Sequence, residues 1–168
     1  MNHKSDKLNL LIRKNKGKEL IPLIKTELEN ITSSSKLVTL EESDEIIERV
    51  KTIQYNNLVN FKINSLIFTN KIPLKCVFDL IAKVDFQHIY ISLGYSEYCG
   101  LAETPSINSF NTDFSFNAEH TGLIVLYSSD IQNKLLLDFY EEAGGKFLDI
   151  EVYGELWSKA SIICNKLI

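Results

Sequence analysis

Apolar and polar residues alternate along much of the second half of this chain. Leu135, Leu137 and Phe139 alternate with their neighbours in the segment 134–142, and the same period of two recurs over 113–119 and 147–154; the apolar segment 122–128 lies between them. This period is typical of strands that bury one face. The pattern therefore predicts four strands in an antiparallel meander, with the last hairpin turning at 144–145, where two glycines stand together.

The segment 131–143 admits a second interpretation. Ser129 and Asp130 can cap a helix at its start, and Gly144 can end one. A strand is favoured, because the alternation continues through Asp138.

Helical spacing of apolar residues dominates the first half of the chain. It predicts a helix over 19–30, with Pro22 near its start, a second over 42–56, and a third over 74–83 that follows Pro73. The acidic residues that open the second helix are interpreted as a stabilising cap on the positive end of its dipole, in preference to a metal or partner site.

Shorter elements complete the pattern. The segments 65–69 and 88–93 indicate strands, 94–111 indicates a long connection, and 155–168 indicates a terminal helix. Together these elements predict an α+β fold, in which an antiparallel sheet of about five or six strands is packed by N-terminal helices and a C-terminal helix.

Length and charge bound the organisation of the chain. Its 168 residues, 45% of them hydrophobic, suffice for one domain. The whole chain has a net charge of −4, and residues 1–18 have a net charge of +5. Residues 19–168 therefore have a net charge of −9. We expect a basic segment over 1–18, solvated and partly frayed, before a single acidic domain over 19–168. An acidic body repels nucleic acid and attracts basic partners.

The three cysteines do not suggest a disulfide framework or a zinc site, because they are widely spread and form no CxxC pair. We expect Cys76 and Cys164 to be packed thiols, in a protein of the reducing cytoplasm. No apolar run reaches the length of a membrane span, and the charged N-terminus does not resemble a signal peptide.

Residues that could perform catalysis are few. Glu119 and His120 could form an acid/base pair, but adjacent residues of a strand or turn point to opposite sides. Asp149 and Glu151 could share a cation, but a third ligand is missing from the pattern. The chain has no GxSxG, GxxxxGKS, GxGxxG or HExxH motif. We therefore expect no enzyme activity, no cofactor and no metal.

The polar positions of the alternating segments are instead typical of a binding surface. They are rich in carboxylates and tyrosines, and carboxylates and a tyrosine recur in the connection before them. The candidate partner-binding residues are Glu97, Glu103, Asp138, Tyr140, Glu142, Asp149, Glu151 and Tyr153.

Several segments between residues 65 and 157 carry a family resemblance: HIYISLG, FNAEHTGLIVLYSSD, LLLDFYEE and DIEVYGELW, together with the IPL that opens the third predicted helix. This series resembles the small cytosolic immunity proteins of bacterial polymorphic toxin systems, including contact-dependent growth inhibition. The resemblance implies binding of one cognate toxin domain, often a nuclease, and occlusion of its active or substrate-binding site. It implies no contact with nucleic acid or membrane, and it transfers no contact residues to this chain.

Two alternatives remain open. A small enzyme could assemble a concealed acid/base site from Glu119, His120 and Asp130. A general interaction or scaffold protein would share the composition but lack a single tight partner.

Overall fold

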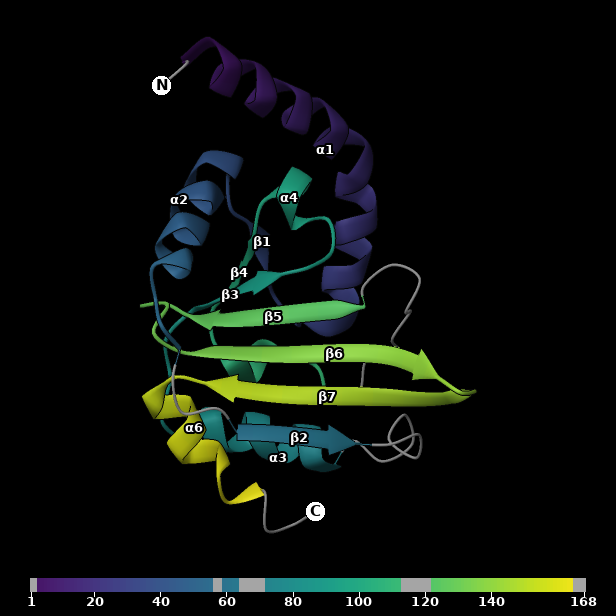
Figure 1. Ribbon diagram of the computed structural model, residues 1–168, viewed down its shortest axis with the longest axis vertical. Coiled ribbons are helices and arrows are strands. Elements are labelled where there is room, and N and C mark those ends of the chain that lie inside the picture. Colours follow the sequence, from purple (N-terminus) through teal and green to yellow (C-terminus); the bar gives the residue numbers. More distant parts are fainter. Residues whose placement is uncertain (1–2, 56–58, 64–71, 113–121, 165–168) are drawn as a thin grey trace.

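The computed structural model describes residues 3–55, 59–63, 72–112 and 122–164. Its centre is an antiparallel sheet of seven strands in the order β1-β4-β3-β5-β6-β7-β2 (Figure 1). The strands are β1 (Lys36–Leu37), β2 (Val59–Ile63), β3 (Ile89–Ser92), β4 (Ala102–Thr104), β5 (Leu123–Ser128), β6 (Lys134–Glu142) and β7 (Gly145–Tyr153).

The helices precede, interrupt and follow this sheet. They are α1 (His3–Ile31), α2 (Leu40–Lys51), α3 (Ile72–Ile81), the short α4 (Ser96–Cys99), the 3-10 helix η2 (Ile107–Ser109) and α6 (Glu155–Ser161). The predicted α+β class, with an antiparallel sheet between N-terminal helices and a C-terminal helix, is confirmed. Three of the seven observed strands, β1, β2 and β4, do not appear among the strands that the sequence predicts; β1 and β4, with two and three residues, are too short to show a period.

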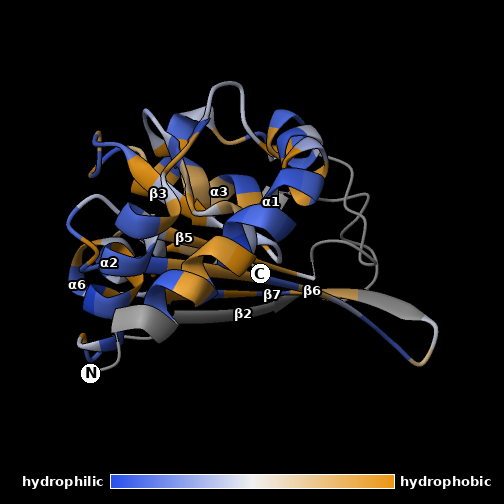
Figure 2. Cartoon of the chain, turned by 90° about the horizontal axis from the view of Figure 1, so that it is seen from above, coloured by the Kyte–Doolittle hydropathy of each residue, from blue (hydrophilic) through white to orange (hydrophobic). Residues whose placement is uncertain are grey.

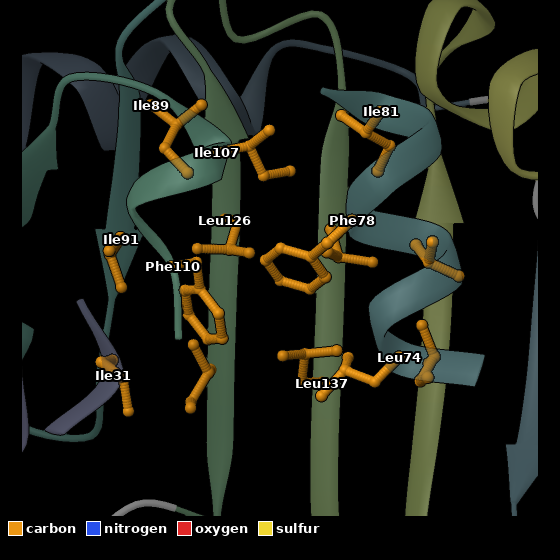
Figure 3. Close-up of a cluster of buried hydrophobic side chains, with 14 of the residues drawn as sticks. Ile31, Leu74, Phe78, Ile81, Ile89, Ile91, Ile107, Phe110, Leu126 and Leu137 are labelled. Atoms are coloured by element: carbon orange, nitrogen blue, oxygen red, sulfur yellow. The ribbon is translucent and has the colours of Figure 1, made fainter. Parts of the chain in front are cut away.

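The inner face of the sheet and three helices enclose the main hydrophobic core. Figure 3 shows Phe78 of α3 and Phe110 against Leu126 and Leu137 of the sheet, and the two phenyl rings lie 4.6 Å apart between centroids. Trp157 of α6 is fully buried in the same core. Apolar parts of the strands and of α3 meet in this interior when the molecule is seen from above (orange in Figure 2). Burial of these apolar side chains is the main contribution to the stability of the fold.

The opposite face of the sheet is covered over part of its width. There Ile46 of α2 packs with Val125 and Tyr127 of β5 and with Ile131 in a second, smaller core. Thr39 caps α2, because its hydroxyl accepts a hydrogen bond from the amide of Glu42 at 3.2 Å. The second core includes Tyr90 of β3 and Leu136 of β6 at its border, and the other outward side chains of β6 and β7 do not belong to it among the described residues.

The basic N-terminal segment is part of one helix. No break occurs at residue 18, where the sequence predicts a boundary, and α1 runs on through Pro22 (Figure 1). Arg13 forms a two-fold hydrogen-bonded ion pair with Asp44 at 2.8 Å, and Lys14 pairs with Glu41 at 2.5 Å. The acidic start of α2 is therefore more than a cap, because it also holds the basic half of α1 against the domain.

Gly17 sets the distance between α1 and α4. A Cβ at this position would lie 2.3 Å from the carbonyl oxygen of Tyr98, which is closer than atoms can approach. Beside it, the ammonium of Lys16 lies 4.1 Å from the centre of the Tyr98 ring. The missing side chain of Gly17 allows this helix contact.

We predict that Gly17→Ala destabilises the protein by about 1–3 kcal/mol, because the methyl group forces α1 away from α4. At an exposed helical position the same substitution would stabilise the protein, because alanine has a higher helix propensity than glycine by about 1 kcal/mol. Urea unfolding measures the change. Asn15→Ala, on the exposed side of the same helix, is the control and should be neutral or stabilising; a stabilised Gly17→Ala would contradict the contact.

Cys76 and Cys164 form a disulfide between α3 and the segment that follows α6. The prediction of two packed thiols is therefore wrong for this pair, although Cys164 is buried as expected. The two residues are 88 positions apart, and only the packing of α6 on α3 brings their Cα atoms to 6.4 Å. Cys99 is the free cysteine and is buried.

We predict that the double substitution Cys76→Ser and Cys164→Ser lowers the free energy of unfolding by about 2–4 kcal/mol under oxidising conditions, because the disulfide closes a long loop in the unfolded chain. Denaturant unfolding with and without dithiothreitol tests this. In the reductant the wild type and the variant should be much closer in stability. Equal stability in the absence of reductant would show that the disulfide contributes nothing.

Other local expectations differ from the structure. The stretch 94–111 is not an irregular connection, because it contains α4, β4 and η2. The second helix ends at Lys51 rather than at residue 56, and β2 follows it in place of a loop. The strands predicted over 65–69 and 113–119 lie outside the described residues. In the part of the chain that the structure describes, every helix is too short or too polar to cross a bilayer.

Candidate binding face

The β6–β7 hairpin carries the candidate site. Its two nine-residue strands pair along their whole length, from Lys134 opposite Tyr153 to Glu142 opposite Gly145. The turn consists of Ala143 and Gly144, which have φ of 51° and 79°, and so lies one residue earlier than the sequence predicts. Positive φ at both positions suits a two-residue turn that follows the twist of the strands. The hairpin reaches beyond the ends of β5 and β2 (Figure 1).

Alternate side chains of this hairpin point away from the main core, on the side of the sheet on which α2 packs. We call this surface the open face. All of its members are half-buried: Lys134, Leu136, Asp138, Tyr140, Phe147, Asp149, Glu151 and Tyr153.

The centre of the open face is a pair of like charges. Asp138 of β6 lies directly opposite Asp149 of β7, with Glu151 two residues further along β7. Burial, and then the charges of Asp149 and Glu151, raise the pKa of Asp138 above its ordinary value. None of the ion pairs between described side chains involves these three carboxylates, and Lys62 of β2 lies opposite Asp149 on its other side in the strand register. One oxygen of Asp149, Oδ1, is buried and accepts no hydrogen bond from a described group.

The end of the open face near the start of β6 has a different character. The ammonium of Lys134 lies between two tyrosine rings, 4.0 Å from the centroid of Tyr153 and 4.8 Å from that of Tyr55. Burial lowers the pKa of Lys134, while nearby Glu151 opposes that shift. The hydroxyl of Tyr153 donates to Glu151, and burial together with this carboxylate raises the pKa of Tyr153 to about 12.

The other end of the open face is aromatic. Tyr140 and Phe147 face each other across the hairpin, with stacked rings 5.4 Å apart between centroids. Leu123 of β5, which lies opposite Asp138 in the register, is 43% exposed. Asp138 thus lies between the apolar side chain of Leu123 on one neighbouring strand and the carboxylate of Asp149 on the other.

The structure brings together most of the predicted partner-binding residues. Asp138, Tyr140, Asp149, Glu151 and Tyr153 share the open face, and Glu142 lies at its tip beside the turn. Two others lie apart from this group.

Glu103 of β4 points to the same side of the sheet but lies at the far edge, where it pairs with Lys36 at 3.2 Å. Glu97 lies on α4, and its carbonyl oxygen accepts a hydrogen bond from Arg13. The sequence could not separate these two from the rest, because their positions depend on the order of the strands.

Three members of the open face are absent from the sequence-based set: Lys134, Leu136 and Phe147. The period of two contains the signal for all three, since they fall on the same parity as Asp138 and Asp149 in their strands. Charge and tyrosine content were too narrow a criterion, because apolar residues complete a binding surface as often as polar ones.

Of the alternative enzyme site the structure describes only Asp130. Glu119 and His120 lie outside the described residues, and the carboxylate of Asp130 accepts hydrogen bonds from Ser128 and from the amide of Gln132. The described residues contain no group of three histidine, cysteine or acidic side chains placed to hold a metal ion.

Comparison with known proteins adds no relative: no protein-family model, no curated protein and no solved structure matches this chain.

We predict that Asp138→Asn stabilises the protein at pH 7 by about 0.5 kcal/mol, within the ~0.2–1 kcal/mol of a cross-strand charge pair. The pKa of Asp138 is raised in the folded state, so its negative charge costs stability at neutral pH, and this cost disappears as acid protonates the carboxyl. Unfolding at pH 7 and at about pH 3, below the ordinary aspartate pKa of about 3.9, should therefore show the gain only at pH 7.

Asp79→Asn is the matched control for this experiment. Its carboxylate pairs with Lys75 on the exposed side of α3, so its removal should bring no gain at pH 7. A loss of stability in Asp138→Asn at pH 7 would show that Asp149 and Glu151 do not repel this charge.

Proposed function

We propose that this chain is an immunity protein, which binds a bacterial toxin domain through the open face and occludes its active or substrate-binding site. The observation that carries the proposal is Asp138, held opposite Asp149, with its pKa raised by burial and by the charges of Asp149 and Glu151. Such a pair costs stability in the free protein, and a basic partner would remove that cost on binding.

A nuclease is the class of toxin that best fits this face. Proteins that bind nucleic acid hold phosphates with lysine and arginine, so a nuclease carries a positive field around its substrate groove. A carboxylate surface on an acidic body can occupy that field, and the opposite charges speed the encounter. Tyr140, Phe147 and Leu123 would supply the desolvated contacts that give such an interface its affinity. The proposal requires no chemistry from this chain.

We propose that this protein binds the toxin in the cytoplasm. Thiols are kept reduced in that compartment, so Cys76 and Cys164 would be two thiols there. Neither cysteine lies on the open face, because both belong to the core on the other side of the sheet. The binding face is built by β6 and β7 alone and does not depend on the disulfide.

The experiment is a protection assay in which a candidate toxin from a neighbouring gene is co-expressed with this chain. We expect wild-type protein to rescue growth, and Asp149→Lys combined with Glu151→Lys to lose the rescue and the binding. Removing one central anchor should weaken binding by about 2 kcal/mol or more, whereas rim charges should alter mainly the association rate and its salt dependence.

Glu97→Lys is the matched control, since it reverses one charge on α4, away from the open face. It should leave the rescue nearly unchanged. If wild type gives no protection, the immunity function is rejected. If folded Asp149→Lys, Glu151→Lys protein still protects and binds, the function stands and the open face is not the interface.

A further inference from the structure

A cavity of about 420 Å³ lies at one end of the sheet, beside the open face. Its walls come from three connections: residues 53–55 after α2, residues 130–133 between β5 and β6, and residues 154–156 where β7 meets α6. Tyr55 joins the cavity to the open face, because its ring packs edge-on against Tyr153 at 6.1 Å between centroids. Ligand pockets measure about 300–1,000 Å³, so the volume suffices for one side chain or a small ligand.

Hydrogen bonds hold the three walls in place. The hydroxyl of Tyr55 donates to the carbonyl oxygen of Ile131 at 2.8 Å. Asn133, which is buried, accepts from the amides of Leu156 and Trp157, both at 3.1 Å. These two amides in the first turn of α6 therefore do not offer the cavity an anion site. The cavity is formed before any ligand arrives.

Close backbone packing fixes the wall at β7 and α6 as well. Gly154 has φ of 88°, and a Cβ there would lie 2.4 Å from the carbonyl oxygen of Gln132. Glycine is required at this position both for the conformation and for the contact.

The described lining of the cavity is rich in hydrogen-bond acceptors, and none of its described residues is a lysine or arginine. Asp130 is oriented through one oxygen, Oδ1, which accepts from the Ser128 hydroxyl at 2.6 Å and from the Gln132 amide at 3.0 Å. Its other oxygen accepts no hydrogen bond from a described group. Glu155 pairs with Lys159 through Oε1 and likewise retains its second oxygen. Gln54 and Gln132, whose side chains carry amide oxygens, also line the cavity.

We propose that this cavity binds a guanidinium group, and that in the complex it receives an arginine side chain of the protein that lies on the open face. A guanidinium presents five N–H donors in a plane, which two carboxylates and several amide oxygens can accept together. The ammonium of Lys134 lies over one face of the Tyr55 ring, so the planar group would stack on the other face. The second half of the proposal depends on the proposed function, whereas guanidinium binding itself does not.

The test is an NMR titration of the whole protein with N-acetyl-L-arginine methylamide. N-acetyl-L-citrulline methylamide, which has nearly the same shape without the charge, is the matched probe. We expect saturable shifts of the backbone amides of Tyr55, Gln132 and Leu156 with the arginine probe, and binding at least tenfold weaker with the citrulline probe.

Substitutions in the cavity test which carboxylate binds the guanidinium group. Asp130→Asn keeps the acceptor for Ser128 and Gln132, and it should weaken arginine binding about tenfold; Glu155→Gln, on an exposed side chain, should weaken it as well. Asp79→Asn on α3 should have no effect. Equal binding of the two probes, shifts that do not centre on the cavity, or unchanged affinity in both cavity variants would overturn the proposal.

Failure of this titration would leave the proposed function standing. The protection assay depends on the charges of the open face, and no toxin is needed to measure the affinity of the probe. Failure of protection with a successful titration would leave a guanidinium site without the proposed partner.

Discussion

The register between β6 and β7 is the constraint on which the rest of this structure depends. Side chains alternate along a strand, so a slip of one residue would exchange every buried and exposed position of the hairpin. In the observed register Leu137 and Ile150 oppose each other in the core, while Asp138 and Asp149 oppose each other outside it. The apolar residues fix the register because their burial outweighs the repulsion of one carboxylate pair by several kcal/mol. The core therefore imposes the arrangement of the open face.

Much of the fold can be predicted where the periodic pattern is long. The bounds of β6 agree with the alternation over 134–142, and α3 lies close to the predicted helix because ten residues show the 3.6-residue period. Short elements escape this reasoning. A four-residue helix such as α4 has about one turn, and its stability comes from contact with α1 at Gly17, a residue about 80 positions away. The helix propensity of residues 96–99 does not reveal a contact with so distant a residue.

Contacts between distant segments explain the remaining differences. The disulfide and the pairing of β2 with β7 join segments separated by some 90 positions, and only the folded topology shows them. The basic start of α1 belongs to the domain for the same reason. Arg13 and Lys14 form ion pairs with α2. A count of charges along the sequence shows only a basic segment, which predicts a solvated terminus. Parity within strands predicted the shared face of Asp138 and Asp149, but strand order alone separates Glu97 and Glu103 from them.

The open face combines two properties that a merely solvated surface does not need. Solvated carboxylates are usually spaced apart or paired with lysines, as Glu103 is with Lys36 at the far edge of the same sheet. Asp138 and Asp149 are instead half-buried and opposite each other across the hairpin, with Leu123 on the other side of Asp138 and Lys62 of β2 opposite Asp149. Such an arrangement reduces stability, and proteins retain such sites where function requires them. A cation brought by a partner gains more from these carboxylates than from exposed ones, because they have already lost part of their hydration in the free protein.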